Sequence, residues 1–404
     1  MKNELNIGDE EKLLLALCRL EFTDENLNKI RSLTSVVRDW KYFRSLANSH
    51  GVAALVWYNL EKHNLLSGIP EEVVTYLKSA LMISLSRNAF NTEAMSEVLR
   101  ILNSENIKTV ILKGLALENS VYGASGLRQM SDVDILINRE KCISARDILI
   151  SKGYASLPVK SAFHKSIMPY FGKHLPSLLK NGMSVEIHNE LFGEKDNVLT
   201  NILYDSSYEV EIKGEKAWFP QPQIFFLYLI KHLWQHEMNN ESQLRLYTDL
   251  VVLIEKHYDE ILNSNLLKYV SGQEMSKMLA SHLEPLRDFW GISFPAPIND
   301  FIEKWHTQDS INRFIFFLYS PKNNPLPDRP GYYRNVIKEI PGFHRKFLYV
   351  LGDLFPSFSF MKNRYNCNSN LRVLFYYPHR VGKILWLFRP LRSLKNANLF
   401  PKKI

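Results

Sequence analysis

Two short segments are most informative about the fold of this chain, Lys108-Thr-Val-Ile-Leu-Lys113-Gly114 and Ser131-Asp-Val-Asp-Ile-Leu-Ile137. Both are short, rich in β-branched and apolar residues, and bounded by glycine or polar residues, so each predicts a buried strand. Long segments before and after them carry apolar residues at intervals of three and four, which is typical of helices. We therefore expect an α+β protein in which a small mixed β-sheet core is embedded in a mostly helical body.

Two hairpins are expected to enlarge this sheet. Asn181-Gly182, the preferred pair for a two-residue type I′ turn, separates residues 174–180 from 183–188. Gly214 lies in the middle of a second candidate hairpin, residues 210–218. The changes in pattern divide the chain into an N-terminal helical region (1–94), the sheet-containing core (95–220), a helical bundle (221–300) and a basic C-terminal helical region (301–404).

The composition of the 404-residue chain is that of a globular protein, with 46% apolar and 23% charged residues. Its three cysteines are too few and too scattered for a disulfide framework or a zinc cluster. The sequence shows neither a secretory signal nor an apolar run of roughly 18 residues, the length that spans a membrane. We therefore expect a cytoplasmic protein without a transmembrane segment.

The excess positive charge is confined to the C-terminal end of the chain. Ten of the 50 lysine and arginine residues follow Asp353, the last acidic residue, so the remainder holds 40 basic and 42 acidic side chains. Such a local positive field recruits acidic partners. Three alternatives stay open: this region binds nucleic acid through its interleaved aromatic residues, it lies on a membrane surface, or it packs against its own protein.

Three acidic residues are candidates for a metal site. Side chains two residues apart on a strand share a face, so Asp132 and Asp134 are expected to stand side by side. Adjacent carboxylates repel each other unless a cation lies between them, and Mg²⁺ prefers oxygen ligands. The same alternation places Glu186 and His188 on one face of a neighbouring strand, which makes Glu186 the expected third ligand. A solvated strand face is the alternative explanation.

A candidate phosphate site precedes these acids. Gly114 follows the first strand and would let the backbone approach phosphate oxygens closely, while the amides that open the next helix favour anions. Lys113 and Arg128 supply positive charge for the same nucleotide, and Ser131 is a further candidate for binding it. Alternatively, the Lys-Gly pair is an ordinary turn after a strand.

These residues together resemble a known family. The segments that carry the similarity are Val110-Ile-Leu-Lys-Gly-Leu-Ala-Leu, Leu127-Arg-Gln-Met-Ser-Asp-Val-Asp-Ile-Leu-Ile137, Val185-Glu-Ile-His-Asn-Glu-Leu191, His232-Leu-Trp-Gln-His236 and Arg245-Leu-Tyr-Thr-Asp249. They are similar to the bacterial uncharacterised nucleotidyltransferases of the polymerase-beta-type nucleotidyltransferase superfamily. The sequence departs from that pattern in two places, because Lys113-Gly114-Leu115 replaces the common Gly-Ser or Gly-Gly, and Glu186 replaces the commoner aspartate.

The resemblance implies a nucleotidyltransferase core and a metal-dependent enzyme. Such an enzyme moves a nucleoside monophosphate from an NTP, with ATP as the expected donor, to a hydroxyl or phosphate of an unidentified small-molecule or peptide acceptor. The implied catalytic residues, which are also the ligands of Mg²⁺ or Mn²⁺, are Asp132, Asp134 and Glu186. The implied nucleotide-binding residues are Lys113, Gly114, Arg128 and Ser131.

Further residues are candidates for the site, and two other functions are possible. The candidates for contacts with the acceptor, or for orienting the groups that touch substrate, are His188, His232 and Asp249. For Asp249 the alternative is an ion pair with Arg245, four residues earlier on the same helix. The alternative functions are a non-catalytic nucleotide- or partner-binding protein on the same fold, and a tRNA-modifying, toxin-like nucleotidyltransferase.

Overall fold

The structure is a computed structural model, and it describes residues 7–123, 126–156, 159–170, 174–192, 197–263, 265–307, 309–321, 336–338, 340–367 and 369–387. The chain forms two compact units. Unit 1 comprises residues 1–156 and 173–325, and unit 2 comprises residues 157–172 and 326–404. The division into four sequence regions stays a prediction.

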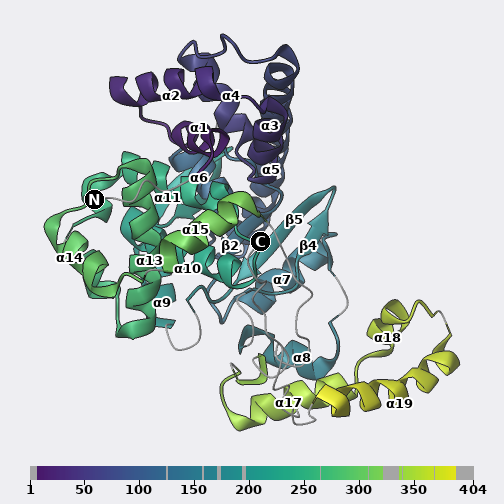
Figure 1. The fold of residues 1–404 in the computed structure, drawn as a ribbon. Helices are drawn as coiled ribbons and strands as arrows, with labels where there is room; N and C mark the ends of the chain where they lie inside the picture. The colour runs from purple at the N-terminus through teal and green to yellow at the C-terminus, as the bar shows by residue number, and fades with distance from the viewer. Residues whose placement is uncertain are drawn as a thin grey trace. The chain divides into compact units, whose positions relative to one another are not determined.

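Helices make up most of unit 1. Figure 1 shows the N-terminal helices in purple and dark blue as one group and the helices that follow the sheet as a second, green group. The helices of this unit are α1 (Asp9–Leu17), α2 (Asp24–Val36), α3 (Trp40–Ser49), α4 (Ala53–Lys62), α5 (Glu71–Ser104), α6 (Lys113–Ser120), α7 (Cys142–Ser151), α9 (Asn197–Ser206), α10 (Pro222–Met238), α11 (Leu244–Lys256), α12 (Tyr258–Ile261), the 3-10 helix η3 (Leu266–Tyr269), α13 (Gly272–Trp290), α14 (Ala296–Trp305) and α15 (Asp309–Tyr319).

A seven-stranded mixed sheet lies among these helices. In their order across the sheet the strands are β3 (Ala155–Ser156), β4 (Leu178–Lys180), β5 (Met183–His188), β2 (Val133–Leu136), β1 (Val110–Leu112), β7 (Glu215–Phe219) and β6 (Tyr208–Ile212). The pairs β2–β5 and β1–β7 are parallel, and the other neighbours are antiparallel. The expected α+β fold with a mixed sheet is confirmed.

Both expected hairpins are present, as β4–β5 and β6–β7. Asn181 and Gly182 both have positive φ, 50° and 89°, as a type I′ turn requires. Lys213 and Gly214 repeat this arrangement with φ of 51° and 81°. The β4–β5 turn fixes the register of β5, and β5 then pairs with β2 at the centre of the candidate site.

The second predicted strand begins later than expected. Pairing of β2 with β5 starts where Val133 lies opposite Val185, so Asp132 precedes the strand and is partly exposed. The strand itself, from Val133 to Leu136, is buried throughout. Asp132 carries a charge that burial would penalise, and it stays where water can reach it. The expectation that both aspartates lie within this strand is therefore wrong.

Unit 2 is helical where it is described, with α8 (Ala162–Ile167), the 3-10 helix η1 (Met168–Tyr170), α17 (Phe343–Leu354), α18 (Phe358–Arg364) and α19 (Asn370–Leu387). Asp353, at the end of α17, is buried and binds two basic side chains. Its Oδ1 lies 2.8 Å from Lys160 Nζ and 3.1 Å from Arg380 Nη2. Part of the basic tail is thus neutralised within its own unit, whereas residues 388–404 lie outside the described residues.

None of the helices in the described part of the chain combines the length and the apolar character needed to cross a membrane.

Candidate active site

Asp134 and Glu186 are brought together by the pairing of β2 with β5. The two strands are parallel, and Asp134 lies opposite Glu186 in their register. Because residues two apart on a strand share a face, His188 lies on the same side as Glu186. One ligand atom from each of these three residues lies within 4.8 Å of the other two. Two carboxylates and an imidazole thus form a group that could hold a metal ion.

Lys113 adds a positive charge to this group. It begins α6 directly after β1, with a φ of 46° that few residues other than glycine adopt. Its Nζ donates to Asp134 Oδ1 over 2.6 Å, and only 9% of the residue is exposed. Burial alone would lower the pKa of Lys113, but the Asp134 carboxylate raises it above its usual range. Lys113 and Asp134 therefore form a buried ion pair.

His188 donates a second hydrogen bond to the same oxygen. Its Nε2 lies 2.7 Å from Asp134 Oδ1, and the residue is fully buried. Burial, helped by the charge of Lys113, lowers the pKa of His188 to about 3, so the ring is neutral at pH 7. Since an ionised carboxylate only accepts hydrogen bonds, the ring proton lies on Nε2. Burial alone would raise the pKa of Asp134, but Lys113 and His188 together hold it well below its usual range.

Glu186 is more accessible than Asp134. Its side chain is 21% exposed, against 6% for that of Asp134. Ser177 Oγ donates to Glu186 Oε1 over 3.1 Å, and His174 Nε2 lies 3.8 Å from Glu186 Oε2. Glu186 therefore has one hydrogen bond and a longer contact with His174 and remains accessible to a ligand, whereas Asp134 accepts two short hydrogen bonds.

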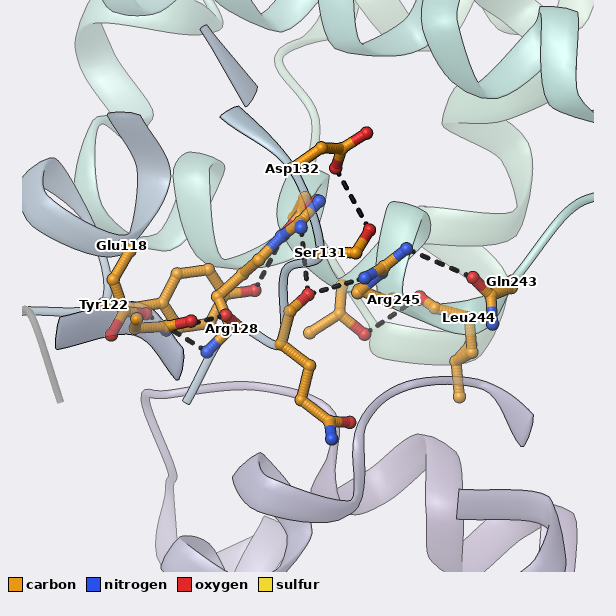
Figure 2. A network of polar contacts seen from close by, with 12 residues as sticks. Glu118, Tyr122, Arg128, Ser131, Asp132, Gln243, Leu244 and Arg245 are labelled. Atoms are coloured by element: carbon orange, nitrogen blue, oxygen red, sulfur yellow. Dashed lines mark hydrogen bonds and ion pairs between the residues drawn. The ribbon is translucent and has the colours of Figure 1, made fainter. Parts of the chain in front are cut away.

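Arg128 is held in place by Asp249 of α11. Its Nε and Nη2 donate to the two carboxylate oxygens over 3.2 and 2.8 Å. Tyr122 adds a hydrogen bond of 3.1 Å to Asp249, and Glu118 accepts from the backbone N–H of Arg128 over 3.2 Å (Figure 2). Asp249 thus pairs with an arginine that is 121 residues away in the sequence. The alternative pairing with Arg245 is wrong, because the guanidinium of Arg128 takes both oxygens.

Gly114 allows Arg128 to lie against the start of α6. A Cβ at this position would come within 2.9 Å of Arg128 Nη1 and 3.2 Å of the Met130 Cβ. Distances below about 3.0 Å are not tolerated by real Cβ atoms, so any larger residue would move the guanidinium. The absence of a Cβ at Gly114 thus leaves room for a side chain of this protein, whether or not a phosphate also approaches it.

A cavity of about 540 Å³ opens beside these residues. Eight of the sequence-predicted residues line it, namely Lys113, Gly114, Arg128, Ser131, Asp132, Asp134, Glu186 and His232. His188 and Asp249 are not among the lining residues, and they instead contact Asp134 and Arg128. The structure thus gathers all the predicted residues in one region and separates those that face the cavity from those that orient them.

Asp132 and His232 line the same cavity but are not members of the group that could hold a metal ion. Asp132 accepts a hydrogen bond of 3.2 Å from Ser131 Oγ, and it is not a member of the group formed by Asp134 and its neighbours (Figure 2). His232 lies on α10, with its ring centroid 4.4 Å from that of His236. These residues widen the polar lining of the cavity beyond the two paired carboxylates.

Six of the lining residues are not among the site residues predicted from the sequence, namely His174, His236, Glu241, Gln243, Arg245 and Leu246. Arg245 is the one arginine among them and adds a positive charge to the cavity. Its Nη1 donates to the Gln129 carbonyl over 2.5 Å and its Nη2 to Gln243 Oε1 over 3.2 Å (Figure 2). Burial and the charge of Arg128 lower the pKa of Arg245 to about 10. The sequence signal that could have found it is its spacing of four residues from Asp249, which puts both on one face of α11.

Comparison with known protein families identifies the family of this chain. No curated protein matches the chain. An antigenic nucleotidyltransferase-like protein from Paracoccidioides brasiliensis has a solved structure that is similar over 51% of this chain and 94% of its own, with 17% identity and a TM-score of 0.35. A structural similarity this low does not establish a shared fold. The sequence model of the uncharacterised nucleotidyltransferase family matches residues 37–291, more than half of the chain. The chain therefore belongs to the uncharacterised nucleotidyltransferase family.

Proposed function

We propose that this protein is a metal-dependent nucleotidyltransferase of the polymerase-beta type. It transfers a nucleoside monophosphate from an NTP to a hydroxyl or phosphate of a small-molecule or peptide acceptor. The observation that carries this proposal is the opposition of Asp134 and Glu186 on paired strands, at a cavity that also contains Lys113 and two arginines. Carboxylates that can hold a metal, next to cations that can meet phosphates, are the parts that this reaction needs.

Asp134 and Glu186 would hold the metal ion, with Asp132 as a further ligand from the same cavity. Carboxylate oxygens suit Mg²⁺ and Mn²⁺, and the imidazole of His188 beside them would extend the choice toward transition metals. The donor set of the structure therefore fits the ion that the family implies. When bound, such an ion would polarise phosphate oxygens and lower the pKa of an acceptor hydroxyl.

The side chains of the cavity have separate roles in this proposal. The acceptor oxygen forms a bond to the α-phosphorus, and the bond from that phosphorus to pyrophosphate breaks. Glu186 is accessible and can accept the proton that leaves the acceptor hydroxyl. Lys113 and Arg128 offset the negative charge that moves to pyrophosphate, and Asp249 keeps Arg128 in one orientation.

The proposal is tested by turnover with a matched control. The purified protein is incubated with each NTP, Mg²⁺ or Mn²⁺ and fractionated cell extract, and pyrophosphate release and nucleotide-sized mass gains are measured. We expect one acceptor class to gain a nucleotide, and Asp134→Asn to abolish this gain. Asp300→Asn, a change at an exposed position of α14, should leave it intact. Release of pyrophosphate by Asp134→Asn at the wild-type rate would contradict the proposal.

A nucleotide-binding protein without turnover is the second candidate. It is favoured by the ion pair between Lys113 and Asp134, because the charge of each residue is already compensated by the other. A metal ion must compete with Lys113 for Asp134, and a phosphate must compete with Asp134 for Lys113. NTP binding by the wild-type protein without pyrophosphate release, under every combination of NTP and metal, would support this second candidate.

A further inference from the structure

One lysine and two arginines line the cavity, and they differ in whether a carboxylate pairs with them. Lys113 pairs with Asp134 over 2.6 Å, and Arg128 pairs with Asp249 over 2.8 Å. Among the residues that the structure describes, Arg245 makes no ion pair and is bonded only to neutral oxygens. Two of the three cavity cations are thus neutralised inside the protein, and the charge of the third remains available to a ligand.

The surroundings of Arg245 hold it in place without forming an ion pair with it, and the carboxylates of Asp249 and Asp132 act on its charge only from a longer range. The Gln129 carbonyl accepts hydrogen bonds from both Arg245 and Arg128, which keeps two positive charges close together. The Arg245 Nε is buried and has no hydrogen-bond partner. A Cβ at Gly51 would lie 3.4 Å from the Arg245 Cδ, so the stem of the side chain packs closely on that backbone. A partly buried cation beside another cation is costly unless an anion compensates it.

We propose that Arg245 is the anion-binding residue of this cavity and that it binds a phosphate-type oxyanion. The planar guanidinium matches such oxyanions, and its neutral partners fix its position without competing for its charge. This inference rests on the proposed function for the source of the anion, which is either the triphosphate of the NTP or an anionic group of the acceptor. Arg245 thereby adds a third positive charge for the anion, beside those of Lys113 and Arg128, which are each paired with a carboxylate.

Isothermal titration of the full-length protein with inorganic anions tests the inference and separates the two sources. In the first arm, tripolyphosphate is titrated into the wild type, Arg245→Gln and the control Arg87→Gln, which changes an exposed arginine of α5. In the second arm, inorganic phosphate is titrated into the same proteins saturated with Mg²⁺ and a non-hydrolysable NTP analogue. We expect Arg245→Gln to weaken binding at least about tenfold in one arm, as the loss of a charge-assisted contact predicts.

The arm that shows the loss identifies the source. A loss confined to tripolyphosphate assigns Arg245 to the NTP, and a loss confined to phosphate assigns it to the acceptor. Binding by Arg245→Gln that equals wild-type binding in both arms would overturn the inference. A second measurement does not depend on the folding of the variant. The anion should protect Arg245, but not Arg87, of the wild type from phenylglyoxal, and equal modification with and without the anion would also overturn it.

Pyrophosphate release tests the proposed function, and anion binding by Arg245→Gln tests the role of Arg245. If the wild type releases pyrophosphate while Arg245→Gln binds both anions normally, the inference fails and the proposed function stands. If anion binding depends on Arg245 but no NTP yields pyrophosphate, the proposed function fails and Arg245 remains an anion-binding residue.

Discussion

Replacing Asp134 by asparagine removes the partner of a buried lysine. Lys113 is 9% exposed and its Nζ lies 2.6 Å from Asp134 Oδ1, so the variant leaves an ammonium in the interior without its carboxylate. Breaking a buried ion pair by removing one partner costs about 3–5 kcal/mol. The loss of the acceptor for His188 Nε2 adds to this cost, although the asparagine oxygen can replace part of it. We expect Asp134→Asn to lower the free energy of unfolding by about 3 kcal/mol at pH 7.

A double-mutant cycle measures how much of this cost belongs to the pair. Lys113→Met removes the stranded charge, so the double variant Lys113→Met/Asp134→Asn should recover most of the loss. Urea unfolding followed by tryptophan fluorescence suits this measurement, because six of the seven tryptophans lie in unit 1. If Asp134→Asn is destabilised by less than about 1 kcal/mol, or if the effects of the two substitutions simply add, the ion pair does not stabilise the protein as expected.

The same pair predicts how the cost depends on pH. The folded protein holds the pKa of Asp134 below the value of 3.8 that it has without neighbours. A carboxylate of this kind contributes stability above its unfolded pKa and loses it as the pH falls toward the folded pKa. The difference in unfolding free energy between the wild type and Asp134→Asn should therefore be constant from pH 7 to about pH 5 and shrink below about pH 4. A difference that grows on acidification would contradict this sign.

Three further predictions follow from other contacts. Gly114→Ala should raise the KM for NTP several-fold in steady-state kinetics, because a Cβ would come within 2.9 Å of Arg128 Nη1 and displace it; an unchanged KM would show that the guanidinium does not bind nucleotide. Glu186→Gln should lower kcat by at least about 100-fold while the Kd for nucleotide changes little, as expected for a residue that accepts a proton, and equal effects on both would argue against that role. Asp353→Asn should lower the thermal stability of unit 2, because Arg380 and a lysine lose their shared carboxylate; limited proteolysis that cuts the variant and the wild type at equal rates would count against this contact.

Local patterns in the sequence were sufficient to predict the strands and the turns of the site. The β-branched run before Gly114 became β1, and Asn181-Gly182 formed the expected turn, because these features depend on a residue and its immediate neighbours. The alternation of Val185 to His188 also placed Glu186 and His188 on one face of β5. The position of Asp132 was not predictable in the same way, because the start of β2 depends on where β5 pairs with it.

The amino-acid sequence was enough to show which residues are chemically unusual: acids beside a buried strand, a Lys-Gly pair after another, and an arginine between them. Which of these residues contact one another depends on the folded chain. It paired Lys113 with Asp134 and Arg128 with Asp249, and among the described residues it gave Arg245 no ion-pair partner. The physical reason is that residues 21 and 121 positions apart come together only through strand register and helix packing over the whole unit. A charge in the sequence has no assigned partner until that packing is complete.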